Sequence, residues 1–450
     1  MRKVLLLMTM MVFLCIGLIA CSSDEAASDS SENDDSSDDM EMGEPQEGGI
    51  LSVGTVTEPD SLDPHNTGQA AANIIMGNIG ASLVFQDPET MEYIPYLAES
   101  WETSEDGKEW TFTLRDEIQF HDGSPITAED FVNTFERAKD TNFVASGNLS
   151  ELESAEAQDE KTLVLTLKEP FAPLLQYLSD PGWLQPLPSD SIASDHEFSR
   201  DPIGAGPWKF DSWNNGQSII LDSNPDFNWG PDYFENTSAV YPDQLEYRFI
   251  EEVETLLAAL DSGSIDVAAD VPATQVESYQ ENDDYYVLER PRNGLGIFIV
   301  FNVENPIFEK IEIRQAINYA IDKDALLKSV LNDQGEISYG PLPSSFFGYD
   351  EEVESYGYHY DTEKAIELIE SAGYTMGEDE VYEKNGEKLE IDLMTQTNGE
   401  TWMQAATVIQ AMLRDVGIQV NVDALEWGTL LDTATNHEFE MTLMGYTYND

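Results

Sequence analysis

The chain carries, from Leu389 to Val422, the stretch LEIDLMTQTNGETWMQAATVIQAMLRDVGIQVNV. Apolar and polar residues alternate at both ends of this stretch, over 389–393 and 418–422, as they do in strands that bury one face. Between the ends, apolar residues recur at helical spacing and are followed by a glycine that can end a helix: Ala405, Ile409, Met412, Leu413 and Gly417. The length suits a strand–helix–strand crossover, so the stretch predicts a unit of an α/β domain.

Outward from this stretch, short strand patterns and amphipathic helices alternate over the chain from Gly48 onward. Strands are predicted at 110–114 and 163–167, where every second residue is apolar. Thr127 and Asp130 form a capping-box pattern ahead of one helix. Asp361 can cap another helix that Gly373 ends. These signals predict a mixed α/β fold.

The N-terminus has the order of charges and apolar residues of a secretory signal peptide. Met1-Arg2-Lys3 precedes an apolar run from Val4 to Ala20. The end of this run, Leu18-Ile19-Ala20-Cys21, resembles the lipobox of bacterial lipoproteins, which implies a signal peptide over 1–20 and a lipid on Cys21. The alternative is an uncleaved membrane-spanning helix, because the run approaches the length that crosses a hydrocarbon core of ~30 Å.

The segment after the lipobox is rich in Ser, Asp and Glu and almost lacks apolar residues. We predict a disordered acidic tether over 21–47, because such a composition buries too little surface to offset the entropy of ordering. The chain has two cysteines, one inside the predicted signal peptide and the other at the lipidation position. A disulfide in the mature protein is therefore excluded.

The charge of the chain excludes one class of partner. The net charge is -67, from 21 basic and 88 acidic residues. Nucleic-acid binding requires basic side chains that neutralise phosphates, so we expect no nucleic-acid partner. Such an acidic composition fits a cell that lives in high salt, where ions screen the repulsion between carboxylates.

The motifs of hydrolases, zinc enzymes and dinucleotide-binding proteins do not occur. The sequence has no Gly-x-Ser-x-Gly and no His-Glu-x-x-His. Gly204-Ala205-Gly206 lacks the third glycine of a dinucleotide loop and is followed by Pro207. We therefore expect a protein that is not an enzyme, with no cofactor and no metal.

Aromatic residues in segments that read as loops are the remaining candidates for a site. Aromatic walls with a few polar groups are typical of binding clefts. Trp213, Trp402, Trp427 and Tyr446 fit this description. The alternative is that each of them packs in the core.

Several motifs, in order along the chain, resemble the family 5 extracellular solute-binding proteins, which serve ABC importers of peptides, dipeptides and nickel. The most specific is Glu58-Pro59-Asp60-Ser61-Leu62-Asp63-Pro64-His65. Others are Phe120-His121-Asp122-Gly123-Ser124-Pro125, Gly204-Ala205-Gly206-Pro207-Trp208, and Arg314-Gln315-Ala316-Ile317-Asn318-Tyr319-Ala320. One departure is Gly80-Ala81-Ser82 before Leu83-Val84, where relatives carry Tyr-Glu, which implies a reshaped pocket wall.

The resemblance implies an α/β, two-lobed, periplasmic-binding-protein-like fold of type II, whose lobes close over a ligand. It places lobe one at 48–290, with an extra subdomain at about 86–200, and lobe two at 291–450. The sequence stops within a segment where the family places cleft residues, so we expect the second lobe to be incomplete. The candidate ligand-binding residues are Asn398, Trp402, Trp427, Tyr446 and Asp450. The resemblance places the segment from Tyr446 to Asp450 in the cleft and implies that Asp450 pairs with the α-amino group of a peptide.

The function implied is that of an extracytoplasmic substrate-binding lipoprotein that captures peptides and delivers them to a membrane permease. The expected partners are a peptide, the permease and ATPase subunits of the importer, and the membrane through the lipid anchor; the protein itself is expected to be a monomer. Alternatives are a receptor for a nickel chelate or an oligosaccharide, a secreted hydrolase, and a purely structural surface protein.

Overall fold

The structure is a computed structural model that describes residues 45–88, 90–140, 143–269, 271–289, 294–344, 349–397 and 400–445. Among the predicted functional residues, Trp402 and Trp427 are described. Cys21, Asn398, Tyr446 and Asp450 lie outside the described residues, as do the predicted signal peptide and nearly all of the predicted tether. Within the described ranges, no helix combines the length and the apolar character that crossing a bilayer requires.

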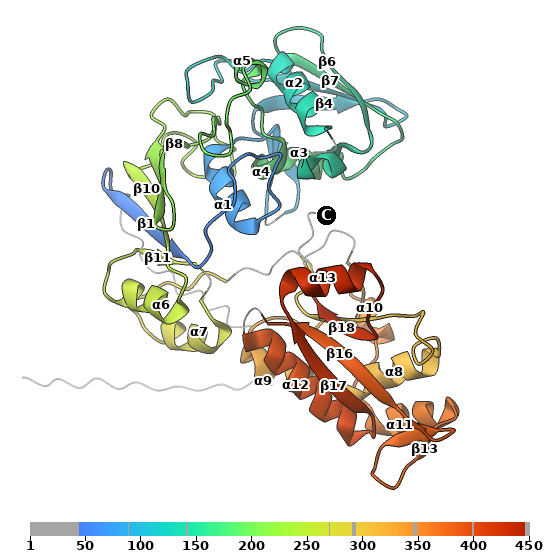
Figure 1. Ribbon diagram of the computed structural model, residues 1–450. Helices are drawn as coiled ribbons and strands as arrows, with labels where there is room; N and C mark the ends of the chain where they lie inside the picture. Colours follow the sequence, from blue (N-terminus) through green and yellow to red (C-terminus); the bar gives the residue numbers. More distant parts are fainter. Residues whose placement is uncertain are drawn as a thin grey trace, which may run out of the picture. The chain divides into compact units, whose positions relative to one another are not determined.

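The first sheet, called here the main N-terminal sheet, has the order β11-β1-β10-β9-β8. Its strands are β1 (Ile50–Thr55), β8 (Trp208–Asn214), β9 (Ser218–Ser223), β10 (Gln244–Phe249) and β11 (Val267–Ala268). β1 runs parallel to β10 and β11, while β9 pairs antiparallel with both β10 and β8. Figure 1 shows β1 beside β10 although they are far apart in the sequence.

Helix α1 (Ala70–Ile79) covers one face of this sheet. Its residues Ile75, Met76 and Ile79 are buried in a cluster with side chains of β8, β9 and β10. The hydroxyl of Tyr247 on β10 accepts a hydrogen bond from Asn78 Nδ2 at 2.9 Å. Burial raises the pKa of Tyr247, so this hydroxyl stays protonated.

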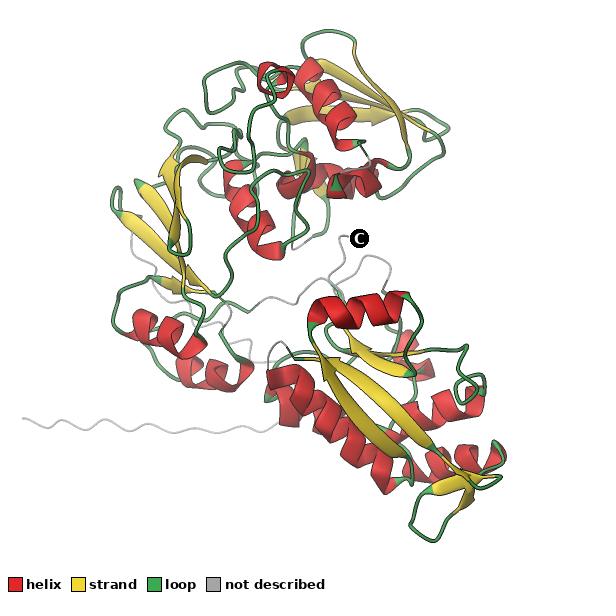
Figure 2. Ribbon diagram, in the orientation of Figure 1, coloured by secondary structure: helices red, strands yellow, loops and turns green. Residues whose placement is uncertain are grey.

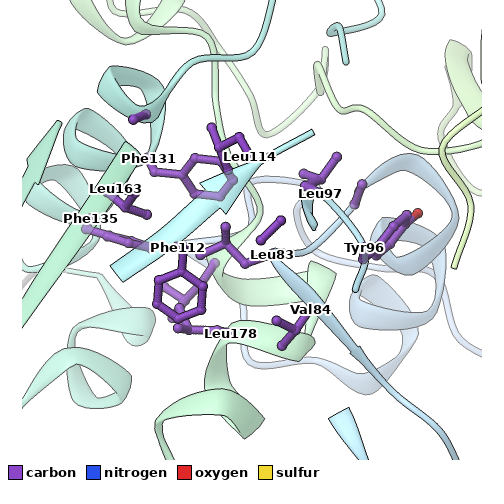
Figure 3. Close-up of a cluster of buried hydrophobic side chains, with 14 of the residues drawn as sticks. Leu83, Val84, Tyr96, Leu97, Phe112, Leu114, Phe131, Phe135, Leu163 and Leu178 are labelled. Atoms are coloured by element: carbon purple, nitrogen blue, oxygen red, sulfur yellow. The ribbon is translucent and has the colours of Figure 1, made fainter. Parts of the chain in front are cut away.

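A second N-terminal sheet has the order β4-β5-β7-β6, with every pair antiparallel. Its strands are β4 (Ala98–Thr103), β5 (Glu109–Leu114), β6 (Leu152–Ala157) and β7 (Thr162–Leu167). Helix α2 (Ala128–Ala138) packs on it, and the predicted capping box of Thr127 and Asp130 is present. Phe131 and Phe135 of α2 meet Phe112 of β5 in the core (Figure 3).

The remaining N-terminal elements are short. They are β2 (Val84–Gln86), β3 (Tyr93–Pro95), η1 (Val144–Leu149), α3 (Leu174–Ser179), α4 (Pro181–Leu184), α5 (Ser189–Ala193), α6 (Val253–Asp261) and α7 (Ala273–Gln280). At Gly80, just after α1, a Cβ atom would lie 2.4 Å from Oε1 of the buried Gln185, which follows α4. Gly80 therefore makes room for the Gln185 amide.

The loop Gly204-Ala205-Gly206 lies directly against the end of α1. A Cβ atom on Gly204 or Gly206 would come within 2.1 Å of Ile79 O or 2.4 Å of Gly80 O, respectively. The amide of Gly206 uses this approach to donate a 2.8 Å hydrogen bond to Ile79 O. Only glycine allows two backbones to approach this closely, so packing against the end of α1 explains the two glycines of this motif.

His121 fixes the same loop from the other side. Gly204 N donates to Nδ1 of His121 at 3.3 Å, and Nε2 donates to Gly206 O at 3.1 Å. Both ring nitrogens are used in the neutral tautomer. Burial lowers the pKa of His121 to about 4, so the ring is neutral at physiological pH.

The C-terminal sheet has the order β12-β18-β16-β17. Its strands are β12 (Phe298–Phe301), β16 (Glu390–Gln396), β17 (Gln419–Leu425) and β18 (Met441–Met444). β16 is parallel to β17 and β18, and β12 is antiparallel to β18. Helix α12 (Glu400–Asp415) joins β16 to β17 and packs on both, which confirms the crossover predicted from 389–422.

Other elements complete the C-terminal region (Figure 2). They are α8 (Ile311–Ala320), α9 (Lys323–Leu331), α10 (Val353–Tyr356), α11 (Thr362–Ser371), β13 (Thr375–Met376), β14 (Tyr382–Lys384), β15 (Glu387–Lys388) and α13 (Trp427–Thr435). The buried core under α8, α11 and α12 includes Ile391 and Leu393 of β16. Asp392, Asn421 and Asp423 are exposed on the opposite face of the sheet.

Candidate ligand-binding site

Three parallel strands of the C-terminal sheet end at one edge, called here the C-terminal carboxyl edge. Their last residues are Gln396 of β16, Leu425 of β17 and Met444 of β18; Gln396 is paired with Leu425. In α/β sheets, ligands bind outside the carboxyl ends of parallel strands. The predicted residues Asn398, Trp427 and Tyr446 each follow one of these strand ends in the sequence, and of the three only Trp427 is described.

Trp402 supports this edge by packing. Its partly buried ring joins the C-terminal core, and its atom Cη2 would be 2.9 Å from a Cβ on Gly445, the residue that follows β18. The same Cβ would lie 2.3 Å from Gly296 O. Trp402 and the backbone at Gly296 therefore leave room only for glycine at position 445. A ligand contact of Trp402 stays a prediction.

Trp427 is the first residue of α13 and is partly exposed. Glu426 caps this helix, because its Oε2 accepts from Gly428 N at 2.9 Å and from Thr429 N at 3.3 Å. Leu431, one turn after Trp427, is 43% exposed. Glu426 and Leu431 are not among the residues predicted from the sequence; the four-residue spacing from Trp427 to Leu431 is the signal that identifies the second.

The main N-terminal sheet has a carboxyl edge of its own, called here the N-terminal carboxyl edge. The parallel strands β1, β10 and β11 end there at Thr55, Phe249 and Ala268. The chain after β10 stays close to β1, since Ile250 N donates to Thr55 O at 2.9 Å. By the same topological rule, this edge is the candidate ligand region of the N-terminal part.

Trp213 is held by contacts with the chain that follows β1. Its Nε1 donates to Glu58 Oε1 at 2.7 Å, and Gly216 N donates to the same oxygen at 3.0 Å. The Arg200 guanidinium lies 3.6 Å from the centroid of the Trp213 ring. Trp213 thus has a scaffold role, and Glu58, the first residue of the Glu58–His65 motif, holds the segment after β1 against it.

Carboxylates dominate the charge near both edges. Asp60, Glu251 and Glu252 are exposed in the segments that follow β1 and β10, and Glu426 is exposed after β17. Among the described residues, no group of three or more His, Cys, Asp or Glu side chains has an arrangement that could hold a metal ion. The described residues at the two carboxyl edges therefore present a ligand with aromatic and apolar side chains, backbone groups at strand ends, and negative charge.

The family is decided by comparison with known proteins. The sequence profile of the bacterial extracellular solute-binding proteins, family 5 Middle, matches residues 92–450. The chain belongs to this family. The oligopeptide-binding protein AppA of Bacillus subtilis is 28% identical over 99% of this chain and 81% of AppA. The probable D,D-dipeptide-binding periplasmic protein DdpA of Escherichia coli is 27% identical over 88% of this chain and 74% of DdpA.

Solved structures agree with this assignment. AppA from Bacillus subtilis in complex with a nonapeptide has a TM-score of 0.71 at 25% identity, over 90% of this chain and 80% of AppA. NikZ from Campylobacter jejuni in complex with Ni(L-His) has a TM-score of 0.71 at 25% identity, over 89% of this chain and 77% of NikZ. The predicted α/β fold of the type II periplasmic-binding-protein class is confirmed. The predicted lobe boundaries and the incompleteness of lobe two stay predictions.

Proposed function

We propose that this family 5 protein is the substrate-binding lipoprotein of an ABC importer, which captures peptides outside the cytoplasm and delivers them to the membrane permease. The observation that carries the proposal is the family match over 92–450 together with relatives named for binding peptides, AppA and DdpA. The protein performs no chemistry on its ligand, as expected for a family of solute-binding proteins.

The carboxyl edges supply the surfaces for such capture. Partly exposed Trp427 and exposed Leu431 form an apolar strip on α13 beside the C-terminal carboxyl edge, suited to an apolar side chain of a ligand. Backbone groups at the strand ends can pair with the main chain of an extended peptide, a mode that tolerates many sequences. Asn398, Tyr446 and Asp450 are the further proposed contacts in the sequence that follows the strands.

The remaining parts of the proposal come from the N-terminal sequence. Cys21 carries the lipid, residues 21–47 form the tether, and the protein acts at the outer face of the cell membrane with the permease and ATPase subunits as partners. Two acyl chains on Cys21 give stable anchoring where one would be marginal. Labelling cells with an alkyne fatty acid tests this: wild-type protein takes up the label, and Cys21→Ala protein does not.

A receptor for a metal chelate is the second candidate, because the structure of NikZ with Ni(L-His) is similar over most of this chain. Mass spectrometry of the small molecules that co-purify with the protein separates the two. Recovered peptides, and a rise in melting temperature on adding peptides back, support the proposed function. Recovery of a metal chelate instead, or cleavage of the added peptides, contradicts it.

A further inference from the structure

The Asn-Gly pairs of the chain are candidates for a chemical modification that needs no enzyme. They are Asn215-Gly216, Asn293-Gly294, Asn385-Gly386 and Asn398-Gly399. Glycine has no side chain to hinder an attack by its own backbone nitrogen on the preceding residue. The structure describes both residues of the first and the third pair, and all of these residues are exposed. Exposure to water therefore does not distinguish these two pairs.

Deamidation of such a pair depends on the glycine nitrogen and on the mobility of the turn. The glycine nitrogen bonds to Cγ of the asparagine, and the side-chain nitrogen leaves as ammonia with the proton that the glycine nitrogen loses. One water then opens the resulting cyclic imide to aspartate or isoaspartate. The attack requires the peptide group between the two residues to rotate toward the side chain. A hydrogen bond to the glycine nitrogen, or a firmly held turn, therefore slows the reaction.

Both reacting groups of the Asn215-Gly216 pair are held by other side chains. Gly216 N donates to Glu58 Oε1 and Oε2 at 3.0 and 3.1 Å. Asn215 Oδ1 accepts from Arg200 Nη1 at 3.2 Å. The turn joins β8 and β9, which pair along their whole lengths. Rotation of the peptide group must break the bond to the Glu58 carboxylate, and hydrogen bonds to charged groups are the stronger ones.

The Asn385-Gly386 pair lacks this protection. Its residues have φ angles of +54° and +84°, which makes the turn between β14 and β15 a type I′ turn. Neither the Asn385 side chain nor Gly386 N has a hydrogen-bond partner among the described residues. β15 lies at the edge of its sheet and is joined to β14 by two residue pairs. Because pairing this short is marginally stable, β15 detaches at little cost and the peptide group is free to rotate.

We propose that Asn385 is a site of spontaneous deamidation, and that the Glu58 carboxylate protects Asn215 from the same reaction. The proposal does not depend on the ligand of the protein. The isoaspartate product has an additional methylene in its backbone, which a type I′ turn does not accommodate. Next to the turn, Lys384 Nζ donates to Ala372 O at 2.6 Å, at the end of α11. Modification of Asn385 should therefore also loosen the contact between the hairpin and α11.

Peptide mapping of the full-length protein tests the proposal. The protein is incubated in mildly alkaline buffer and digested, and mass spectrometry follows the loss of the unmodified peptide around each asparagine. We expect Asn385 to react about ten-fold faster than Asn215, or more, because the bond to the Glu58 carboxylate adds to the barrier at Asn215. The Asn385 products should separate into aspartate and isoaspartate. Equal rates, or a faster reaction at Asn215, overturn the proposal.

Two further measurements identify the cause of the difference. In urea, where both turns are lost, the two rates should converge; a difference that persists there lies in the neighbouring sequence and contradicts the proposal. Glu58→Ala frees Gly216 N and should speed Asn215 several-fold while leaving Asn385 unchanged. Glu235→Ala removes another exposed carboxylate and should change neither rate. An unchanged Asn215 rate in Glu58→Ala, or equal acceleration of both sites, shows that Glu58 does not protect Asn215.

Discussion

Arg137 binds both carboxylate oxygens of Asp63: its Nη1 lies 2.9 Å from Oδ1 and its Nη2 lies 2.5 Å from Oδ2. Nη1 also lies 2.6 Å from Nδ1 of the fully buried His65. The rings of Phe143 and Phe198 cover the guanidinium at 4.5 and 5.3 Å. Asp63 and His65 belong to the turn before α1, and Arg137 to the last turn of α2. The ion pair therefore connects the segment between β1 and α1 to helix α2, which packs on the second N-terminal sheet.

Replacing one partner of this pair should destabilise the protein strongly. The Arg137 and Asp63 side chains are 16% and 9% exposed, so Asp63→Asn leaves a guanidinium that is buried without its charge partner. Such changes cost about 3–5 kcal/mol. Urea unfolding measures this. The control is Asp116→Asn, which breaks the exposed ion pair of Lys161 and Asp116 and should cost less than about 1 kcal/mol. A similar loss of unfolding free energy in both variants would show that the buried ion pair stabilises the protein no more than the exposed one.

The neutral state of His121 should make stability depend on pH. Burial lowers its folded-state pKa to about 4, from about 6.5 in the unfolded chain. The unfolded state therefore binds more protons between these values. The stabilisation is complete above pH ~6.5 and is lost as pH falls toward ~4, by up to about 1.4 kcal/mol per pH unit.

His121→Asn removes this titration while keeping a side-chain amide near Gly206 O. Between pH 7.5 and 5.5, wild-type protein should lose about 1 kcal/mol more unfolding free energy than the variant. His65, whose pKa burial and next the Arg137 charge lower to about 3, is present in both proteins and does not affect the comparison. Parallel pH profiles of the two proteins would contradict a neutral, buried His121.

Gly206→Ala should be among the more damaging glycine substitutions. The new Cβ would lie 2.4 Å from Gly80 O, a backbone atom at the end of α1 that cannot move aside without breaking the contact between the loop and this helix. We expect the free energy of unfolding to fall by roughly 2–4 kcal/mol, as for other strained or overpacked sites. The control is Gly77→Ala in α1, where nothing lies within 4 Å of the new Cβ. There the gain in helix propensity should stabilise the fold by up to ~1 kcal/mol. Thermal unfolding of both variants decides, and a stable Gly206→Ala protein would refute the close approach.

Local patterns predicted local structure well in this chain. The alternation at 389–393 and 418–422 corresponds to β16 and β17, which extend to Gln396 and Leu425. Asp361 caps α11 through a 2.9 Å bond from Lys364 N, and Gly373 after this helix has a φ of +92°. Each of these features depends on residues that are neighbours in the sequence.

Contacts between distant segments could not be predicted in the same way. Nothing near Glu58 in the sequence indicates that its carboxylate accepts a hydrogen bond from Trp213, and nothing near Gly80 indicates the amide of Gln185. For the same reason, the sequence identifies aromatic candidates but does not show which of them pack in the scaffold and which are accessible to a ligand. Trp213 and Trp402 take part in scaffold contacts, while Trp427 presents part of its surface at a strand end.

This difference between the tryptophans predicts different effects of their removal. Trp427→Ala should weaken peptide binding about ten-fold or more, since a partly exposed indole beside the strand ends offers surface to a ligand at little structural cost. Trp402→Ala should instead unfold at lower temperature, because it removes packing against Gly445 and the C-terminal core. Calorimetric titration with a bound peptide identified by mass spectrometry, run beside thermal unfolding, measures both effects. Unchanged affinity in Trp427→Ala together with a large loss of stability would place Trp427 in the scaffold and remove it from the proposed site.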